Sequence, residues 1–265
     1  MAIANAVVGA ISLEGQSAIV TGAGRGIGRA IAMRFAEAGA KIVLAARTAE
    51  QVEAVHREIV AAGGEAIAVP TDVTVDEQVH ALVEQAQTAF GGIDVLVNNA
   101  GRNPFIVPTH EARLDGVDKV FAVNWRGPYL LSQLCGQRMI EQGRGGAIVQ
   151  ILSQSAWMGV TGNAPYGGAK AALMRASEAM ACEWGEFGIR VNCIGPGFIQ
   201  TDMTRRQWED PERLAAVKRT IPLGRIGQPQ EIANISLFLV SDLSSFVTGQ
   251  TIWAEGGQGP VRPGG

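Results

Sequence analysis

The sequence is poor in cysteine, in aromatic residues and in charge of either sign. Of its 265 residues, 6% are aromatic and 18% are charged, and the net charge is −3. No basic run is present, so nucleic acid is not expected as a partner, because a phosphate backbone is bound by clustered Lys and Arg. The three cysteines, Cys135, Cys182 and Cys193, form no CxxC motif. We expect small buried apolar side chains rather than disulfides, and a reducing, cytoplasmic compartment.

Long apolar runs and an early basic residue are also missing. No Lys or Arg precedes Arg25, whereas a signal peptide has a basic start, and no apolar stretch approaches the ~20 residues that span a bilayer. We expect no membrane association, an N-terminal arm over residues 1–12 and a flexible tail over residues 259–265. His56, His80 and His110 lie far apart without ligand spacing, so no metal site is expected.

The sequence does contain a regular alternation of short apolar runs and helical patterns. Apolar runs at residues 18–20, 41–45, 66–69, 94–97, 146–152, 189–194 and 251–253 predict strands. Apolar residues at helical spacing separate them, and Thr74 with Glu77 predicts a capping box before one helix. This order predicts an α/β fold in a single domain over residues 13–258. We expect a doubly wound, parallel, seven-stranded sheet of Rossmann type with helices on both faces.

The first predicted strand runs into a glycine-rich turn. Residues 21–28 are TGAGRGIG, and apolar residues at helical spacing follow until Gly39. Glycine permits positive φ and close backbone approach, and the first amides of a helix point unpaired at an anion. A tight turn without a ligand is the alternative. A strand, a glycine turn and a helix in succession are, however, the context of a dinucleotide-phosphate site.

The glycine turn and several later motifs occur together in a recognisable order. They are T-G-x-x-x-G-x-G from Thr21, NNAG at residues 98–101, Asn124, Ser153 after the fifth predicted strand, Y-x-x-x-K from Tyr166, and P-G-x-x-x-T from Pro196. Together they resemble the classical short-chain dehydrogenase/reductase family, of the 3-oxoacyl-[acyl-carrier-protein] reductase type, over nearly the whole chain. The resemblance implies a nicotinamide cofactor, a small carbonyl or alcohol substrate and a homotetramer.

The resemblance assigns catalysis to four residues, which are Asn124, Ser153, Tyr166 and Lys170. Tyr166 and Lys170 are four apart and share one face of a helix. A free tyrosine has a pKa of ~10, and the adjacent ammonium is expected to lower it toward the working range. By resemblance, Tyr166 transfers the proton and Ser153 holds the substrate oxygen. Lys170 also bonds the nicotinamide ribose, and Asn124 holds a water that links this lysine to solvent.

The end of the second predicted strand bears on the choice of cofactor. A fold of this type that prefers NAD has an acid there, which binds the ribose 2′-hydroxyl. Here the position is Ala46, followed by Arg47 and Thr48, and Arg25 lies in the glycine turn. Guanidinium groups can hold a 2′-phosphate through paired hydrogen bonds, so NADP(H) is favoured over NAD(H). A solvated Arg47 is the alternative.

The resemblance implies a larger set of binding residues. Those expected at the cofactor are Gly22, Arg25, Gly26, Ile27, Gly28, Arg47, Thr48, Asp72, Val73, Asn98, Ala100, Gly101, Tyr166, Lys170, Pro196, Gly197, Ile199 and Thr201. Those expected at the substrate are Phe105, Gln154, Trp157, Asn163, Phe198 and Met203. Residues near 202–222 are expected to form a lid over the substrate.

These features predict an NADP(H)-dependent oxidoreductase that reduces a ketone or 3-oxoacyl-type carbonyl to a secondary alcohol. An NAD(P)-dependent secondary-alcohol or sugar dehydrogenase is an alternative, because the chemistry is reversible. A cofactor-sensing regulator without activity is a further alternative, since fold alone does not fix function. Such a sensor has no need of Ser153, Tyr166 and Lys170 together, which favours an enzyme.

Overall fold

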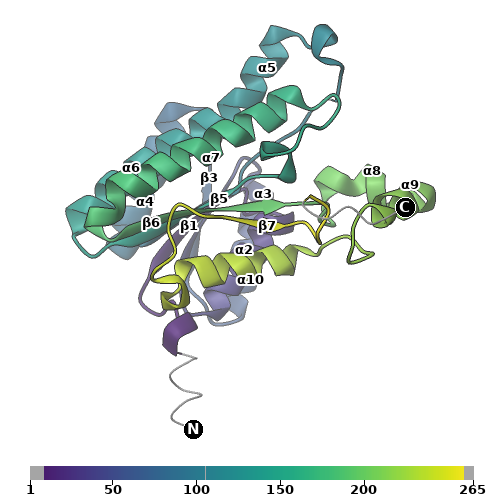
Figure 1. The fold of residues 1–265 in the computed structure, drawn as a ribbon. Helices are drawn as coiled ribbons and strands as arrows, with labels where there is room; N and C mark the ends of the chain where they lie inside the picture. The colour runs from purple at the N-terminus through teal and green to yellow at the C-terminus, as the bar shows by residue number, and fades with distance from the viewer. Residues whose placement is uncertain (1–8, 105, 260–265) are drawn as a thin grey trace.

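The computed structural model describes residues 9–104 and 106–259, which form one parallel sheet between two layers of helices (Figure 1). The strands are β1 (Ser17–Thr21), β2 (Lys41–Ala46), β3 (Ala66–Pro70), β4 (Val95–Asn98), β5 (Gly146–Ile151), β6 (Ile189–Pro196) and β7 (Thr251–Ala254). Their order is β3-β2-β1-β4-β5-β6-β7, and every neighbouring pair is parallel. The predicted fold class is confirmed. Phe105, most of the expected N-terminal arm and most of the tail lie outside the described residues.

Helices cover both faces of the sheet. One face packs against α2 (Gly26–Glu37), α3 (Ala49–Ala61) and α10 (Pro229–Val240). The other packs against α4 (Asp76–Phe90), α6 (Gly127–Gln142) and α7 (Ala164–Trp184), with α5 (Leu114–Phe121) leading into α6. The central strands are buried on both sides and therefore consist of nearly continuous Val, Ile, Leu and Ala.

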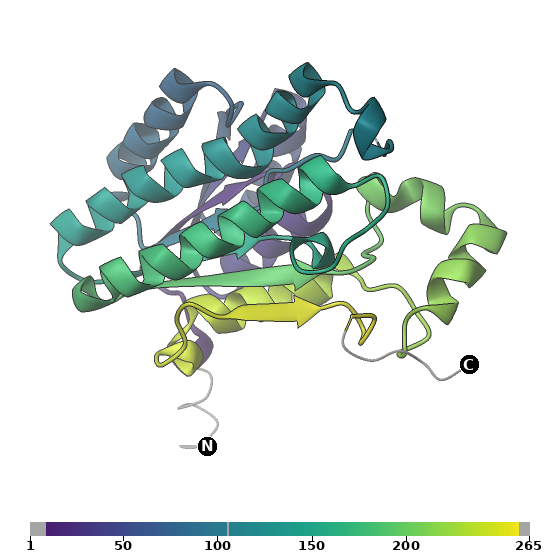
Figure 2. The same ribbon diagram turned by 45° about the horizontal axis from the view of Figure 1, so that its top comes forward.

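The strand order places a crevice at one edge of the sheet. The chain runs outward from β1 to β3 and then returns to β4 on the other side of β1. Ligands of such sheets bind beyond the carboxyl ends of the strands at this switch point. Two short helices, α8 (Arg205–Trp208) and α9 (Pro211–Arg219), project beyond the same edge, where the lid is expected (Figure 2).

Two local expectations are wrong. Thr74 does not cap α4, because its hydroxyl donates to Asp72 Oδ1 at 2.7 Å and the helix starts at Asp76. Cys135 and Cys193 are buried as expected, but Cys182 is exposed. Among the described residues, no helix is both long enough and apolar enough to cross a bilayer, and no group of three metal-ligand side chains is present.

Candidate active site

The glycine turn between β1 and α2 is shaped to admit a phosphate. Gly22 and Gly26 have φ of +64° and +55°, which residues with a Cβ rarely adopt. A Cβ on Gly28 would stand 2.2 Å from the Gly22 carbonyl oxygen, so only glycine allows this approach. No side chain caps the start of α2, and its first turn holds no acid. The first amides of α2 are therefore available to an anion, and the residues present fit a dinucleotide pyrophosphate.

The NNAG segment after β4 braces this turn. Thr21 Oγ1 accepts hydrogen bonds from the backbone N–H of Asn99 and of Ala100, each at 3.0 Å. Asn99 Nδ2 donates to the Thr21 carbonyl at 2.9 Å. Asn98, expected from the sequence at the cofactor, instead points away from the turn. Its buried amide donates to Ser132 Oγ at 2.9 Å, so it anchors β4 to α6.

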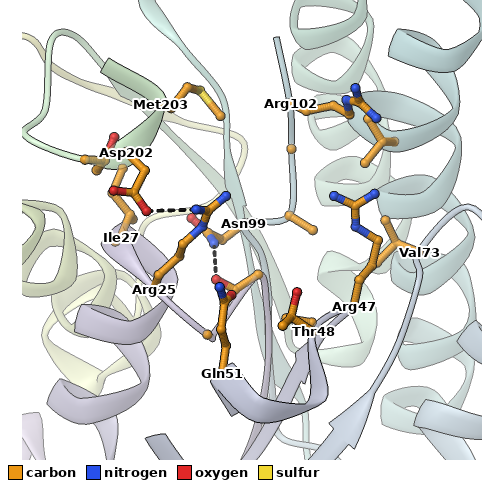
Figure 3. Close-up of a pocket in the computed structure, with 18 of the residues that line it drawn as sticks. Arg25, Ile27, Arg47, Thr48, Gln51, Val73, Asn99, Arg102, Asp202 and Met203 are labelled. Atoms are coloured by element: carbon orange, nitrogen blue, oxygen red, sulfur yellow. Dashed lines mark hydrogen bonds and ion pairs between the residues drawn. The ribbon is translucent and has the colours of Figure 1, made fainter. Parts of the chain in front are cut away.

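A cleft of about 470 Å³ opens over the turn (Figure 3). Eleven residues expected at the cofactor line it: Gly22, Arg25, Gly26, Ile27, Arg47, Thr48, Asp72, Val73, Ala100, Gly101 and Thr201. Asn99 and Arg102 also line it, although the sequence analysis did not include them. Arg102 directly follows the NNAG motif at the end of a neighbouring strand, and this position was the available signal.

Charged side chains stand on opposite sides of the cleft (Figure 3). On one side Arg25 Nη1 pairs with Asp202 Oδ2 of the expected lid at 2.8 Å. On the other side lie Arg47 and Arg102, and neither forms an ion pair within the described part of the chain. Burial raises the pKa of Asp72, but hydrogen bonds from Thr74, helped by the charges of both arginines, bring its net pKa below the ordinary value. The side with Arg47 and Arg102 thus carries two guanidinium groups that are not held in ion pairs among the described residues.

Ser153, Tyr166 and Lys170 meet beside the cleft. Ser153 follows β5, while Tyr166 and Lys170 lie one turn apart on α7, with Lys170 Nζ 6.0 Å from the phenol ring centre. Burial raises the pKa of Tyr166 to about 12, and the Ser153 hydroxyl offsets part of this rise. Burial lowers the pKa of Lys170 to about 8. The expected lowering of the Tyr166 pKa is therefore wrong for the chain alone, since desolvation outweighs the hydrogen bond from Ser153.

Packing positions these three side chains. Lys170 Nζ donates to the Ile151 carbonyl at the end of β5, at 2.7 Å. A Cβ on Gly167 would stand 2.7 Å from the Ser155 carbonyl oxygen, so glycine lets α7 approach the loop that carries Ser153. Ser153 in turn accepts a hydrogen bond from the Ser155 N–H at 3.2 Å, which fixes the start of this loop.

Asn124 is fully buried in a π-helical turn, residues 122–126, between α5 and α6. Such turns interrupt α-helices most often at functional sites. The Asn124 side chain accepts from the Arg102 N–H at 3.2 Å and donates to the Arg102 carbonyl at 2.8 Å. A Cβ on Gly101 would stand 2.8 Å from Asn124 Oδ1 and 3.4 Å from Lys170 Nζ. Gly101 also lines the cleft, so Asn124 and Lys170 lie directly behind the cleft wall.

The residues expected at the substrate are divided between two places. Met203 lines the cofactor cleft. Asn163 accepts from Asn103 Nδ2 at 2.8 Å and donates to Ser155 Oγ at 3.0 Å, which ties it to the loop after Ser153. Gln154 and Trp157 belong to this same loop, and Phe198 lies half-buried after β6.

Known proteins resemble this chain over most of its length. A family model described as enoyl-(acyl carrier protein) reductase matches residues 22–258. D-erythrulose reductase of Gallus gallus is 38% identical over 250 residues, covering 93% of this chain and 97% of that protein. L-rhamnose 1-dehydrogenase (NAD(P)(+)) of Azotobacter vinelandii is 39% identical over 249 residues, covering 91% and 96%.

A solved structure extends the likeness to three dimensions. Gluconate 5-dehydrogenase from Burkholderia cenocepacia, crystallised with NADP and tartrate, superposes with a TM-score of 0.91 at 32% identity, over 96% of this chain and 99% of that one. With these similarities, the chain belongs to the short-chain dehydrogenase/reductase family. It is an oxidoreductase that acts on a carbonyl or a secondary alcohol and binds a nicotinamide cofactor.

Proposed function

We propose that this chain reduces a ketone or 3-oxoacyl-type carbonyl to a secondary alcohol with NADP(H), and that Tyr166 donates the proton. The observation that carries the proposal is the meeting of Ser153, Tyr166 and Lys170 beside a dinucleotide-shaped cleft. A binding protein would have no use for a buried phenol and a buried ammonium at this position, because burying each has a cost in desolvation.

The chemistry divides between cofactor and chain. When bound, a reduced nicotinamide would be the source of the hydride for the carbonyl carbon. Tyr166, with its pKa raised to about 12, stays protonated at neutral pH and can give a proton to the developing alkoxide. Ser153 holds the carbonyl oxygen by a hydrogen bond. Lys170, with its pKa near 8, is mostly an ammonium at neutral pH and stabilises the phenolate left behind.

The proposed preference for NADP(H) rests on the end of β2. No carboxylate stands at Ala46, and Arg47 lines the cleft with Thr48 beside it. Arg102 adds a second guanidinium on the same side. A 2′-phosphate would meet both charges, whereas the 2′-hydroxyl of NAD would find no acceptor at Ala46.

The oxidative direction is the second candidate. The names of relatives include a rhamnose dehydrogenase as well as an erythrulose reductase, and the same residues serve both directions. We further propose a homotetramer, by family resemblance, and a cytoplasmic location, which the free thiols of Cys135, Cys182 and Cys193 support.

The test is the rate of NADPH and NADH oxidation with a panel of cyclic, aromatic, acyl-thioester and sugar ketones. Turnover with NADPH on one class, and much slower turnover with NADH, would support the proposal. Turnover of alcohols with NAD⁺ alone would favour the oxidative candidate. The absence of turnover in both directions, with NADPH still bound, would favour a cofactor-sensing regulator.

A further inference from the structure

The carboxyl ends of β5, β6 and β7 lie side by side at the edge of the sheet that holds the active site (Figure 2). Each strand is followed by a short segment that carries polar or aromatic side chains. Ser153, Gln154 and Trp157 follow β5, Gly197 and Phe198 follow β6, and the segment from Glu255 follows β7. Because Ser153 and Gln154 are consecutive, whatever binds at these segments lies next to the proposed reacting centre.

Glu255 is a buried carboxylate that forms no ion pair with any of the described residues. Only 6% of the residue is exposed. One oxygen, Oε1, accepts from the Gly259 N–H at 3.1 Å. The other, Oε2, has no hydrogen-bond donor among the described residues, and none of their Lys, Arg or His side chains forms an ion pair with it. Burying a carboxylate in this way is costly unless a ligand donates to it.

Two further buried acceptors belong to the segments that follow β7 and β5. Gln258 donates through Nε2 to Thr220 Oγ1 at 2.7 Å, which leaves its buried Oε1 without a donor. Gln154 Oε1 is also buried and without a donor. With Glu255 Oε2, these make three of the six side-chain polar atoms that are buried and unpartnered in the part of the chain that the structure describes.

Glycine positions relate these acceptors to one another. A Cβ on Gly197 would stand 3.1 Å from Gln154 Oε1 and 2.9 Å from Glu255 Cβ, so these two side chains flank the same glycine. A Cβ on Gly259 would stand 2.7 Å from Glu255 Oε2 and 2.1 Å from Trp157 Cζ2. The unpaired carboxylate oxygen therefore lies beside Trp157, a residue that is 44% exposed and whose ring centre is 5.7 Å from that of Trp253.

We propose that Gln154, Trp157, Glu255 and Gln258 form a substrate subsite for a neutral polyhydroxylated carbonyl or alcohol, that is, a small ketose or polyol. This inference rests on the proposed function and names its substrate class. Hydroxyl groups donate the hydrogen bonds that three acceptors lack, and the C–H face of a polyol packs on the indole ring. A substrate with a carboxylate is disfavoured, because its charge would meet Glu255 without a compensating cation.

The comparison that tests this subsite is between a four-carbon ketose, 2-butanone and the corresponding keto acid. We expect wild-type kcat/KM with NADPH to be highest for the ketose. In Glu255→Gln, which keeps the shape and removes the charge, the ratio of ketose to butanone kcat/KM should fall about tenfold, mainly through KM. Glu186→Gln, an exposed glutamate at the opposite edge, is the control and should keep the wild-type ratio.

A second measurement separates this inference from the proposed function. Calorimetry of erythritol or threitol binding to the NADPH-saturated chain needs no turnover, because the alcohol and the reduced cofactor cannot react with each other. Polyol binding that weakens about tenfold in Glu255→Gln supports the subsite, whether or not any ketone in the panel is reduced. Failure to reduce any ketone would contradict the proposed function, not the subsite. Should Glu255→Gln fail to fold, Gln154→Leu gives the same two readouts. The inference would be overturned if a folded variant kept both the wild-type ratio of ketose to butanone kcat/KM and the wild-type polyol affinity. It would also be overturned if an amino polyol or the keto acid bound more tightly than the neutral polyol.

Discussion

The two halves of the active-site edge carry opposite chemistry. Beyond β2 and β4, Arg47 and Arg102 present guanidinium groups to the cleft. Beyond β5 and β7, Gln154 Oε1 and Glu255 Oε2 are buried acceptors without a donor among the described residues. A polyanionic cofactor and a neutral hydroxylated substrate would each find its complement in one half and not in the other. Charge alone can therefore direct the two ligands to their own ends of one crevice.

The halves also differ in what builds them. The cofactor half depends on backbone, since glycines at 22, 26 and 28 leave room for phosphate and the start of α2 offers its amides. The proposed substrate half depends on side chains from two loops, which follow β5 and β7. Tyr166 and Lys170 stand at the boundary, on a long helix whose packing fixes them. Chemistry placed on a rigid helix between two loops permits the substrate half to vary while the reaction stays the same.

The largest effect on activity is expected at Tyr166, which lies between the two halves. Tyr166→Phe removes the proton donor but keeps the ring, so we expect kcat to fall at least ~100-fold, the lower end for general acid catalysis. NADPH binding, followed by fluorescence, should change little. Tyr129→Phe is a matched control, because Tyr129 is the only other tyrosine in the sequence and its side chain is exposed, stacked on Trp125. Retention of wild-type kcat in Tyr166→Phe would remove Tyr166 from its proposed role.

The second largest effect is expected on cofactor affinity, from the arginines of the cofactor half. Arg47→Ala should weaken NADPH by ~1–3 kcal/mol, the range for a charge-assisted hydrogen bond, and weaken NADH much less. Dissociation constants for both cofactors test this. Arg57→Ala removes an exposed arginine from α3 and should affect neither. Equal losses of NADPH and NADH in Arg47→Ala would speak against contact with the 2′-phosphate.

The pH profile tests the boundary residues without changing the fold. The pKa of Lys170 is lowered to about 8, so its ammonium is present below this pH and lost above it. Tyr166, with a pKa of about 12, remains protonated throughout. We expect reductive kcat/KM to be level below pH ~8 and to fall about tenfold per pH unit above it. Lys170→Met should abolish this break. A wild-type profile that stays level to pH ~9.5 would contradict the role of the ammonium.

The sequence predicted the fold well because its signals are local. All seven strands lie within two residues of the apolar runs that predicted them, and the glycine turn follows β1 as its spacing indicated. The facing of Tyr166 and Lys170 follows from helical geometry alone. Neither prediction needs knowledge of distant contacts.

What the sequence could not predict depends on register, burial and distant pairs. Successive side chains at the end of a strand point to opposite sides, so Asn98 faces α6 and Asn99 faces the glycine turn. Because both residues are asparagine, the sequence does not indicate which of them faces the turn. The burial of Glu255 and the raised pKa of Tyr166 arise from segments remote in sequence. So does the pairing of Arg25 with Asp202.

That last pair gives the smallest and most specific prediction. Arg25, expected from the sequence at the 2′-phosphate, is instead held by Asp202, with which it forms a partly exposed ion pair at 2.8 Å. A hydrogen bond from Arg205 lowers the pKa of Asp202, opposed by burial and aided by Arg25, so Asp202 is charged at neutral pH. Asp202→Asn should release Arg25 toward the cleft and raise NADPH affinity relative to NADH about two- to fivefold, the scale of an exposed ion pair. High salt should shrink the difference.

The matched control is Glu212→Gln, an exposed acid on the neighbouring helix α9, which should leave the affinity ratio at the wild-type value. A fall in the NADPH to NADH affinity ratio in Asp202→Asn would mean that Asp202 positions Arg25 for the cofactor rather than withholding it. The cofactor would then meet three arginines, and Asp202 of the expected lid would position one of them, Arg25. Closure of the lid over the substrate would in that case also increase the affinity for the cofactor.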